Sequence, residues 1–134
     1  MTTRKTSAPT RLPTDAELDI LHVLWDQGPS TVRAVQKHLA TDRPTVYTTV
    51  LKQLQVMTEK GLVRRNVRFR SHVYEARSRR EETQRRIAAD LLDRAFRGSA
   101  PALLLGVLSA RSATPSDLAE IRKMIDDYES KRPR

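Results

Sequence analysis

RPTVYTTVLKQLQVMTEKG, residues 43–61, is the stretch that decides the fold. Pro44 fits the first turn of a helix and Gly61 fits the position just past its end, because proline lacks the amide that a first turn leaves unpaired and glycine readily takes positive φ. Four apolar side chains recur between them three or four residues apart and predict one buried face: Val46, Val50, Leu54 and Met57.

The opposite face of this predicted helix carries hydroxyl, amide and ammonium groups but no carboxylate. Its members are Thr45, Thr48, Thr49, Lys52, Gln53 and Val56. The first acid, Glu59, comes only at the far end. Hydroxyls, amides and ammonium groups can bond to base edges and phosphates. Because an ordinary solvated face mixes acids with bases, this face is predicted to be the surface of a DNA recognition helix.

Two helices are predicted in front of the recognition helix. Thr14 and Glu17 form a capping-box pattern, in which each side chain bonds the backbone amide of the other residue. The helix that follows has a leucine-rich side ending in Trp25, which is expected in the core. Ser30 is predicted to cap a second helix over residues 31–40. Two helices, a short turn and a third helix form the arrangement that reads the major groove.

A two-stranded hairpin is predicted directly behind the recognition helix, because the period changes there from helical to alternating. One strand starts at residue 62 and its partner includes residues 72–75. Four arginines lie around it: Arg64, Arg65, Arg68 and Arg70. Arginine is common on exposed hairpins, but this density beside a recognition helix favours a basic wing on the phosphate backbone. Arg43 and Tyr47 are predicted as further backbone contacts, and the base contacts as Thr45, Thr48, Thr49, Lys52 and Gln53.

Residues 78–134 predict three helices that pair with a second copy of the chain. Ser78 with Glu81, Ser99 and Thr114 fit the starts of these helices. A domain this short is marginal alone, and DNA readers of this size commonly use two-fold symmetry, so a dimer is favoured over packing within a monomer. The predicted dimerisation residues are Ile87, Leu91, Leu92, Phe96, Leu103, Leu104, Leu108, Leu118, Ile121, Ile125 and Tyr128.

Composition limits the classes of function that this chain can have. The net charge of +9 and the pI of about 10.6 favour a polyanionic partner. The chain has no cysteine and its three histidines lack metal-ligand spacing, so no metal or cofactor is expected. No motif joins a nucleophile to a base, so the protein is not expected to be an enzyme. The N-terminus lacks a secretory pattern and no apolar run could cross a bilayer, so a cytoplasmic protein without membrane insertion is expected.

The predicted fold is mainly α with a small β-hairpin. A flexible arm over residues 1–11 precedes a winged helix-turn-helix domain over residues 12–77, and a three-helix dimerisation domain follows over residues 78–134. Two alternatives to a dimeric DNA-binding protein of this kind remain. One is a basic RNA-binding module, although such modules usually show aromatic residues on a sheet or a glycine-rich clamp. The other is a winged-helix regulator whose C-terminal domain responds to a small molecule.

VYTTVLKQLQVMTEKGLVRR, residues 46–65, resembles the penicillinase-repressor family, the BlaI/MecI/CopY-type transcriptional repressors. ELDILHVLW, residues 17–25, and Val73-Tyr74 also match, so the resemblance covers about residues 12–130. It implies a winged-helix domain, a helical dimerisation domain and binding of a homodimer to dyad-symmetric operators in double-stranded DNA. Similar proteins repress genes for β-lactam antibiotic resistance, copper handling or other stress responses.

Three features depart from the family pattern. Copper-sensing relatives carry a cysteine cluster, which this chain lacks. Antibiotic-responsive relatives are inactivated by cleavage of an Asn-Phe bond, and the resemblance places Gly106 and Val107 at that position. A membrane-bound sensor protease is thus a candidate partner whose specificity would differ. The wing turn of relatives often contains glycine, and here Arg68 and Phe69 take its place.

Overall fold

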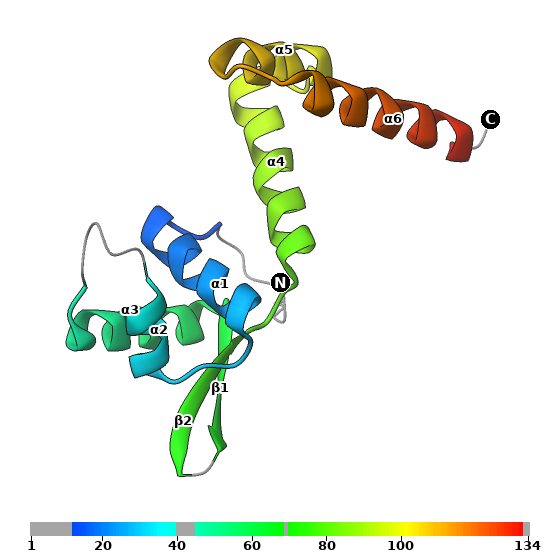
Figure 1. Cartoon of the computed structure of the whole chain (residues 1–134). Helices are drawn as coiled ribbons and strands as arrows, with labels where there is room; N and C mark the ends of the chain where they lie inside the picture. The colour runs from blue at the N-terminus through cyan, green and yellow to red at the C-terminus, as the bar shows by residue number, and fades with distance from the viewer. Residues whose placement is uncertain (1–11, 40–44, 69, 133–134) are drawn as a thin grey trace. The chain divides into compact units, whose positions relative to one another are not determined.

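The computed structural model describes residues 12–39, 45–68 and 70–132 (Figure 1). These residues form six helices and one two-stranded antiparallel sheet, as the sequence predicts. The elements are α1 (Asp15–Gln27), α2 (Val32–His38), α3 (Tyr47–Lys60), β1 (Val63–Arg68), β2 (Ser71–Ala76), α4 (Arg80–Phe96), α5 (Ala100–Ala110) and α6 (Pro115–Lys131). Among the described residues, no helix is both long enough and apolar enough to cross a bilayer. The predicted N-terminal arm lies outside the described residues.

The chain divides into two compact units, the first ending at Ala88 and the second beginning at Ala89. The division therefore falls inside α4, whereas the predicted boundary at residue 78 lies before that helix. The first turns of α4 belong to the first unit, because Thr83 is buried there.

The predicted capping box at the start of α1 is confirmed. The Thr14 amide donates to Glu17 Oε1 at 2.9 Å, and the Glu17 amide donates to Thr14 Oγ1 at 3.2 Å. Glu17 is only 2% exposed, and its Oε2 accepts from Lys60 Nζ at 2.7 Å. Burial acts to raise the pKa of Glu17, but the bonds from Lys60 and Thr14 and the Lys60 charge together hold it below its ordinary value of 4.5. This ion pair links the first turn of α1 to the last turn of α3.

The N-cap of α2 is Thr31, so the predicted cap at Ser30 is wrong. The Thr31 side chain accepts from the Ala34 amide at 3.1 Å. Ser30 is instead held by β2, where its amide and carbonyl bond to Tyr74 at 2.9 and 2.8 Å. Because this pairing uses the Ser30 backbone, the helix begins one position later. It ends at His38, before the predicted end at residue 40.

The core of the first unit lies where the three helices meet the base of the hairpin. Its fully or nearly fully buried members are Ile20, Leu21, Val23, Leu24, Val32, Val35, Val50, Leu54, Met57, Leu62, Val63 and Tyr74. Trp25 packs against this cluster as predicted, and its Nε1 donates to the Ser78 carbonyl at 2.9 Å. Burying these apolar side chains is the main term that stabilises the unit.

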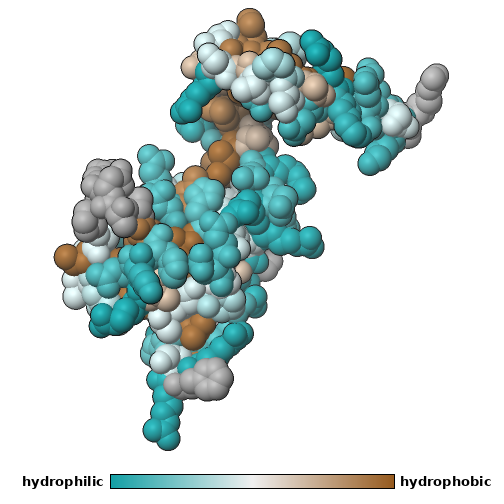
Figure 2. Space-filling model, in the orientation of Figure 1, coloured by the Kyte–Doolittle hydropathy of each residue, from teal (hydrophilic) through white to brown (hydrophobic). Residues whose placement is uncertain are grey.

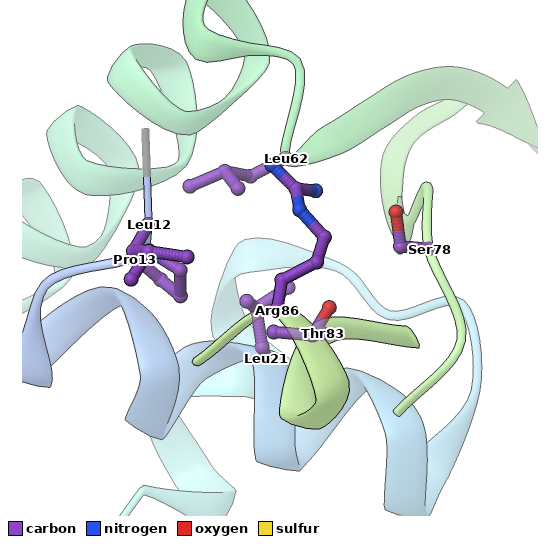
Figure 3. Close-up of a pocket in the computed structure, with 7 residues that line it drawn as sticks. All are labelled: Leu12, Pro13, Leu21, Leu62, Ser78, Thr83 and Arg86. Atoms are coloured by element: carbon purple, nitrogen blue, oxygen red, sulfur yellow. The ribbon is translucent and has the colours of Figure 1, made fainter. Parts of the chain in front are cut away.

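The start of α4 differs from its prediction, because no capping box joins Ser78 to Glu81. The helix begins at Arg80, and the Arg79 amide donates to Glu82 Oε1 at 3.2 Å. The contact between Trp25 and Ser78 fixes the chain two residues before this start. A small pocket lies beside it, between α1 and α4, with room for roughly one water molecule (Figure 3). Its lining residues are Leu12, Pro13, Leu21, Leu62, Ser78, Thr83 and Arg86.

The second unit contains the end of α4 and the whole of α5 and α6. The predicted caps are confirmed, since Ser99 accepts from the Ala102 amide and Thr114 forms a capping box with Asp117. No described residue of α5 or α6 is buried. Hydrophobic surface is visible in brown over α4 and α5 (Figure 2). These helices thus expose the apolar residues that a core would normally cover.

Candidate nucleic-acid interface

Helix α3 starts at Tyr47, later than the sequence predicts. Val46 is the N-cap, in an extended conformation with φ −74° and ψ 157°, and its side chain is 62% exposed. The predicted places of Val46 on the buried face and of Thr45 on the helix are therefore wrong. Pro44, predicted in the first turn of the helix, and Arg43 lie outside the described residues.

A tertiary hydrogen bond explains the late start. Gln36 of α2 donates from Nε2 to the Thr45 carbonyl at 3.1 Å. The first helical bonds then go to the Val46 carbonyl, which accepts from the amides of Thr49 and Val50 at 3.1 and 3.2 Å. Gln36 thereby fixes where the recognition helix begins.

The rest of α3 has the two predicted faces. Val50, Leu54 and Met57 are completely buried. The opposite side, here called the recognition face, is open to solvent and lines a shallow groove: Thr48, Thr49, Lys52, Gln53 and Val56. None of these five residues is acidic. The face therefore presents two hydroxyls, an amide and an ammonium group that can meet base edges without repelling DNA.

The predicted wing arginines do not form a single surface. The register pairs Arg64 with Glu75 and Arg68 with Ser71, so these arginines share one face of the hairpin. Glu75 lies within 3.8 Å of Arg64 and 3.9 Å of Arg68, and it accepts a bond from Asn66 at 2.9 Å. Part of the positive charge on this face is thus compensated by a carboxylate.

The other face of the hairpin carries Arg65, Val67 and His72. Arg65 lies opposite Tyr74, and Val67 lies opposite His72. Val67 alternates along β1 with Arg64 and Arg68, which lie on the other face. It is nevertheless 65% exposed, because the hairpin extends beyond the core. Arg68 and Ser71 are the last paired residues of the hairpin, and Arg70 lies in the turn at its tip.

Arg70 has φ 66°, in the left-handed region. This conformation favours glycine or asparagine, because a Cβ approaches the following carbonyl oxygen. Phe69 lies outside the described residues. The turn that often contains glycine in relatives is thus built here with an arginine in a strained conformation.

A second groove, here called the α2–wing groove, joins three elements of the first unit. Its lining residues are Thr31, Val32, Arg33, Tyr47, Leu51, Arg70, Ser71 and His72. The Arg33 guanidinium carbon lies 5.3 Å from the centre of the Tyr47 ring, within the range of a cation–π contact. Sequence reasoning names Tyr47 and Arg70 but misses Arg33, because only the fold brings α2 beside the start of α3 and the wing tip.

The predicted dimerisation residues are distributed over α4, α5 and α6, and none of them is buried. Ile87 belongs to the first unit and the others to the second. Leu91, Leu104, Ile125 and Tyr128 are exposed. Gly106 and Val107, the predicted cleavage region, lie inside α5, and a Cβ at Gly106 would stand 3.4 Å from the Phe96 ring.

The described ranges contain no group of three metal-ligating side chains. A comparison with curated proteins finds no match. The family model described as penicillinase repressor matches residues 13–127, which include the winged helix and most of the C-terminal helices. Together with the recognition face and the hairpin behind it, this match shows that the chain belongs to the penicillinase-repressor family of regulatory DNA-binding proteins.

Proposed function

We propose that the protein is a transcriptional repressor of the BlaI/MecI type that binds dyad-symmetric operators as a homodimer. The observation that carries this proposal is the recognition face. Three of its five residues are exposed and two are partly exposed, none is acidic, and the face lies opposite a completely buried stripe that fixes its orientation. A helix held in this way can present its outer side chains to the major groove.

Sequence preference would come from two long polar side chains in the middle of the recognition face. Lys52 can donate to the acceptors of guanine, and Gln53 can pair with adenine. Thr48 and Thr49 are shorter and suit contacts with either base edges or phosphates. The wing arginines Arg64, Arg65, Arg68 and Arg70 supply contacts with the backbone beside the groove.

Dimerisation is supported by the exposed apolar residues of the second unit. The described parts of α5 and α6 bury no side chain. A unit of this size therefore needs a partner that covers its apolar residues in order to be stable. A second copy of the chain is the simplest partner, because a two-fold axis brings the same apolar face together with itself. Two linked recognition helices would then read two half-sites about 34–36 Å apart or at a multiple of that distance.

Derepression would follow from loss of the dimer, because two linked half-sites bind far better than one. Cleavage by a membrane-bound sensor protease at Gly106 and Val107 would require α5 to unwind locally, since both residues lie within that helix. In this proposal the protein acts in the cytoplasm and controls genes for antibiotic resistance or another stress response.

Selection from a library of random DNA duplexes tests the proposal. The wild-type protein should enrich sequences with two inverted half-sites, and light scattering should give twice the chain mass of 15.3 kDa. Structured RNA should compete poorly with the selected duplex. Enrichment of no sequence, a monomer on DNA, or preferential binding of RNA would each contradict the proposed repressor.

A further inference from the structure

We infer that the α2–wing groove is a seat for one phosphate of the DNA backbone, and that Arg33 is its principal ligand. The inference rests on the proposed function, because it assumes that the recognition face meets duplex DNA. It adds a residue from the scaffold helix α2 to an interface otherwise formed by the recognition helix and the wing. It also divides the wing cations into those that face the groove and those that do not.

Three separate elements contribute donors to this groove. Arg33 comes from α2, Tyr47 from the first turn of α3, and Arg70 and His72 from the wing. None of the eight lining residues is acidic. A phosphate needs several donors that converge from different directions, and arginine provides them in a planar fork.

Within the described residues, no salt bridge neutralises the two arginines that line the groove. Across the parts of the chain that the structure describes, neither Arg33 nor Arg70 has a carboxylate oxygen within 4.0 Å. Arg64 and Arg68, on the other face of the hairpin from His72, both lie within that distance of Glu75. The groove is therefore better suited to bind a phosphate than the face of the wing that carries Arg64 and Arg68.

The Tyr47 ring positions Arg33. Its centre lies 5.3 Å from the guanidinium carbon, so the ring limits the orientations that the long arginine side chain can take. A guanidinium held against an aromatic ring keeps its N–H edges available for a phosphate. Because Tyr47 is in the first turn of α3, the seat is fixed relative to the recognition face.

The conformation of Arg70 is a second, independent sign of a binding site. Its φ of 66° is unfavourable for arginine, although glycine or asparagine would fit the turn with less strain. Strained residues persist where the surrounding structure uses them, often at ligand-binding positions. Arg70 at this tip position supplies a positive charge to the phosphate seat, which glycine could not supply.

The salt dependence of DNA binding tests the seat. Each phosphate contact that is lost flattens the slope of log K against log salt by about 0.9. Arg33→Ala should therefore flatten the slope by about one and weaken binding about tenfold, as expected for loss of a charged hydrogen bond. Arg85→Ala on α4 removes the same charge outside the groove and should leave the slope unchanged. Thermal melting of both variants checks that they are folded, which the exposure of Arg33 favours.

A double-mutant cycle tests the positioning role of Tyr47. Tyr47→Phe keeps the ring and should preserve the effect of Arg33→Ala on the salt slope. Tyr47→Leu removes the ring, so Arg33→Ala should weaken binding less in that background than in the wild type. Equal effects in both backgrounds would overturn the positioning role.

The outcomes separate this inference from the proposed function. A wild-type protein that binds duplex DNA, with the same salt slope for Arg33→Ala as for Arg85→Ala, overturns the phosphate seat alone. Binding without enrichment of any sequence overturns the operator-specific repressor, and the slope comparison on random duplex still decides the seat. Failure of the wild-type protein to bind any duplex overturns both.

Discussion

Under the proposed repressor function, Lys52 is the residue expected to distinguish one base from another. Lys52→Ala should relax sequence preference at one position of each half-site, with a loss of about 1–3 kcal/mol for the preferred base. Arg65→Ala on the wing should instead weaken selected and random duplexes alike. Titration of both variants against a panel of single-base substitutions checks this difference. Equal losses on every duplex for Lys52→Ala would remove it from the base-reading set.

Lys60 neutralises the buried carboxylate of Glu17, so its loss is expected to reduce stability strongly. Lys60→Met keeps most of the aliphatic stem but leaves the carboxylate unpaired. The free energy of unfolding should fall by about 3 kcal/mol, at the low end for a broken buried pair because Lys60 is partly exposed. Urea unfolding measures the change. Lys37→Met on the exposed side of α2 is the control and should change stability by less than about 0.5 kcal/mol.

The same ion pair predicts a dependence of stability on pH. The pKa of Glu17 lies below its ordinary value of 4.5, so the folded state favours the charged form. A depressed pKa contributes stability that is complete above the unfolded value and is lost as pH falls through the folded value. The wild-type protein should therefore lose stability below about pH 4.5 more steeply than Glu17→Gln. Parallel stability curves for the two proteins between pH 7 and pH 3 would contradict this assignment.

At the scale of elements, a substitution in the wing turn is expected to raise the stability of the hairpin and to lower DNA affinity. Arg70→Asn should stabilise the hairpin by about 0.5–1 kcal/mol, because asparagine tolerates the left-handed conformation better than arginine. The same change removes a cation from the α2–wing groove, so DNA affinity should fall. Arg70→Lys keeps both the strain and the charge and serves as the control. A variant that gains both stability and affinity would show that the turn is not shaped by binding.

Local patterns and tertiary contacts explain which elements could be predicted. Val50 on the buried face of α3 follows from helical periodicity, a property of the segment alone. The late start at Tyr47 does not, because it depends on a hydrogen bond from Gln36 in another helix. Ser30 does not cap α2 for a similar reason, since β2 pairs with its backbone. Arg33 carries no local signal of function, because its neighbours in the groove are distant in sequence.

At the scale of the whole molecule, dimerisation should depend on the apolar stripe of α6. Ile125 is 47% exposed and lies on the same stripe as Leu118, Ile121 and Tyr128. Ile125→Glu places a charge on that stripe and should shift the protein from dimer to monomer. DNA affinity should then fall by about 10²–10⁴, the usual gain from linking two sites.

Lys123→Gln on the opposite side of the same helix is the matched control, since it also makes the net charge more negative by one. It lies off the stripe and should leave the dimer intact. Sedimentation velocity distinguishes the two species. A dimer that survives Ile125→Glu would place the subunit contact on other helices.

Trp25 is the only tryptophan of the chain, which makes it an intrinsic optical reporter. Its ring lies edge-to-face with His22 at 5.4 Å and beneath the Arg80 guanidinium at 5.6 Å, and its N–H is bonded to Ser78. Emission from this single fluorophore therefore monitors the junction of α1 with the first turn of α4. A red shift when dimers are diluted into monomers would reveal, without any label, that separation of the subunits loosens the DNA-binding unit itself.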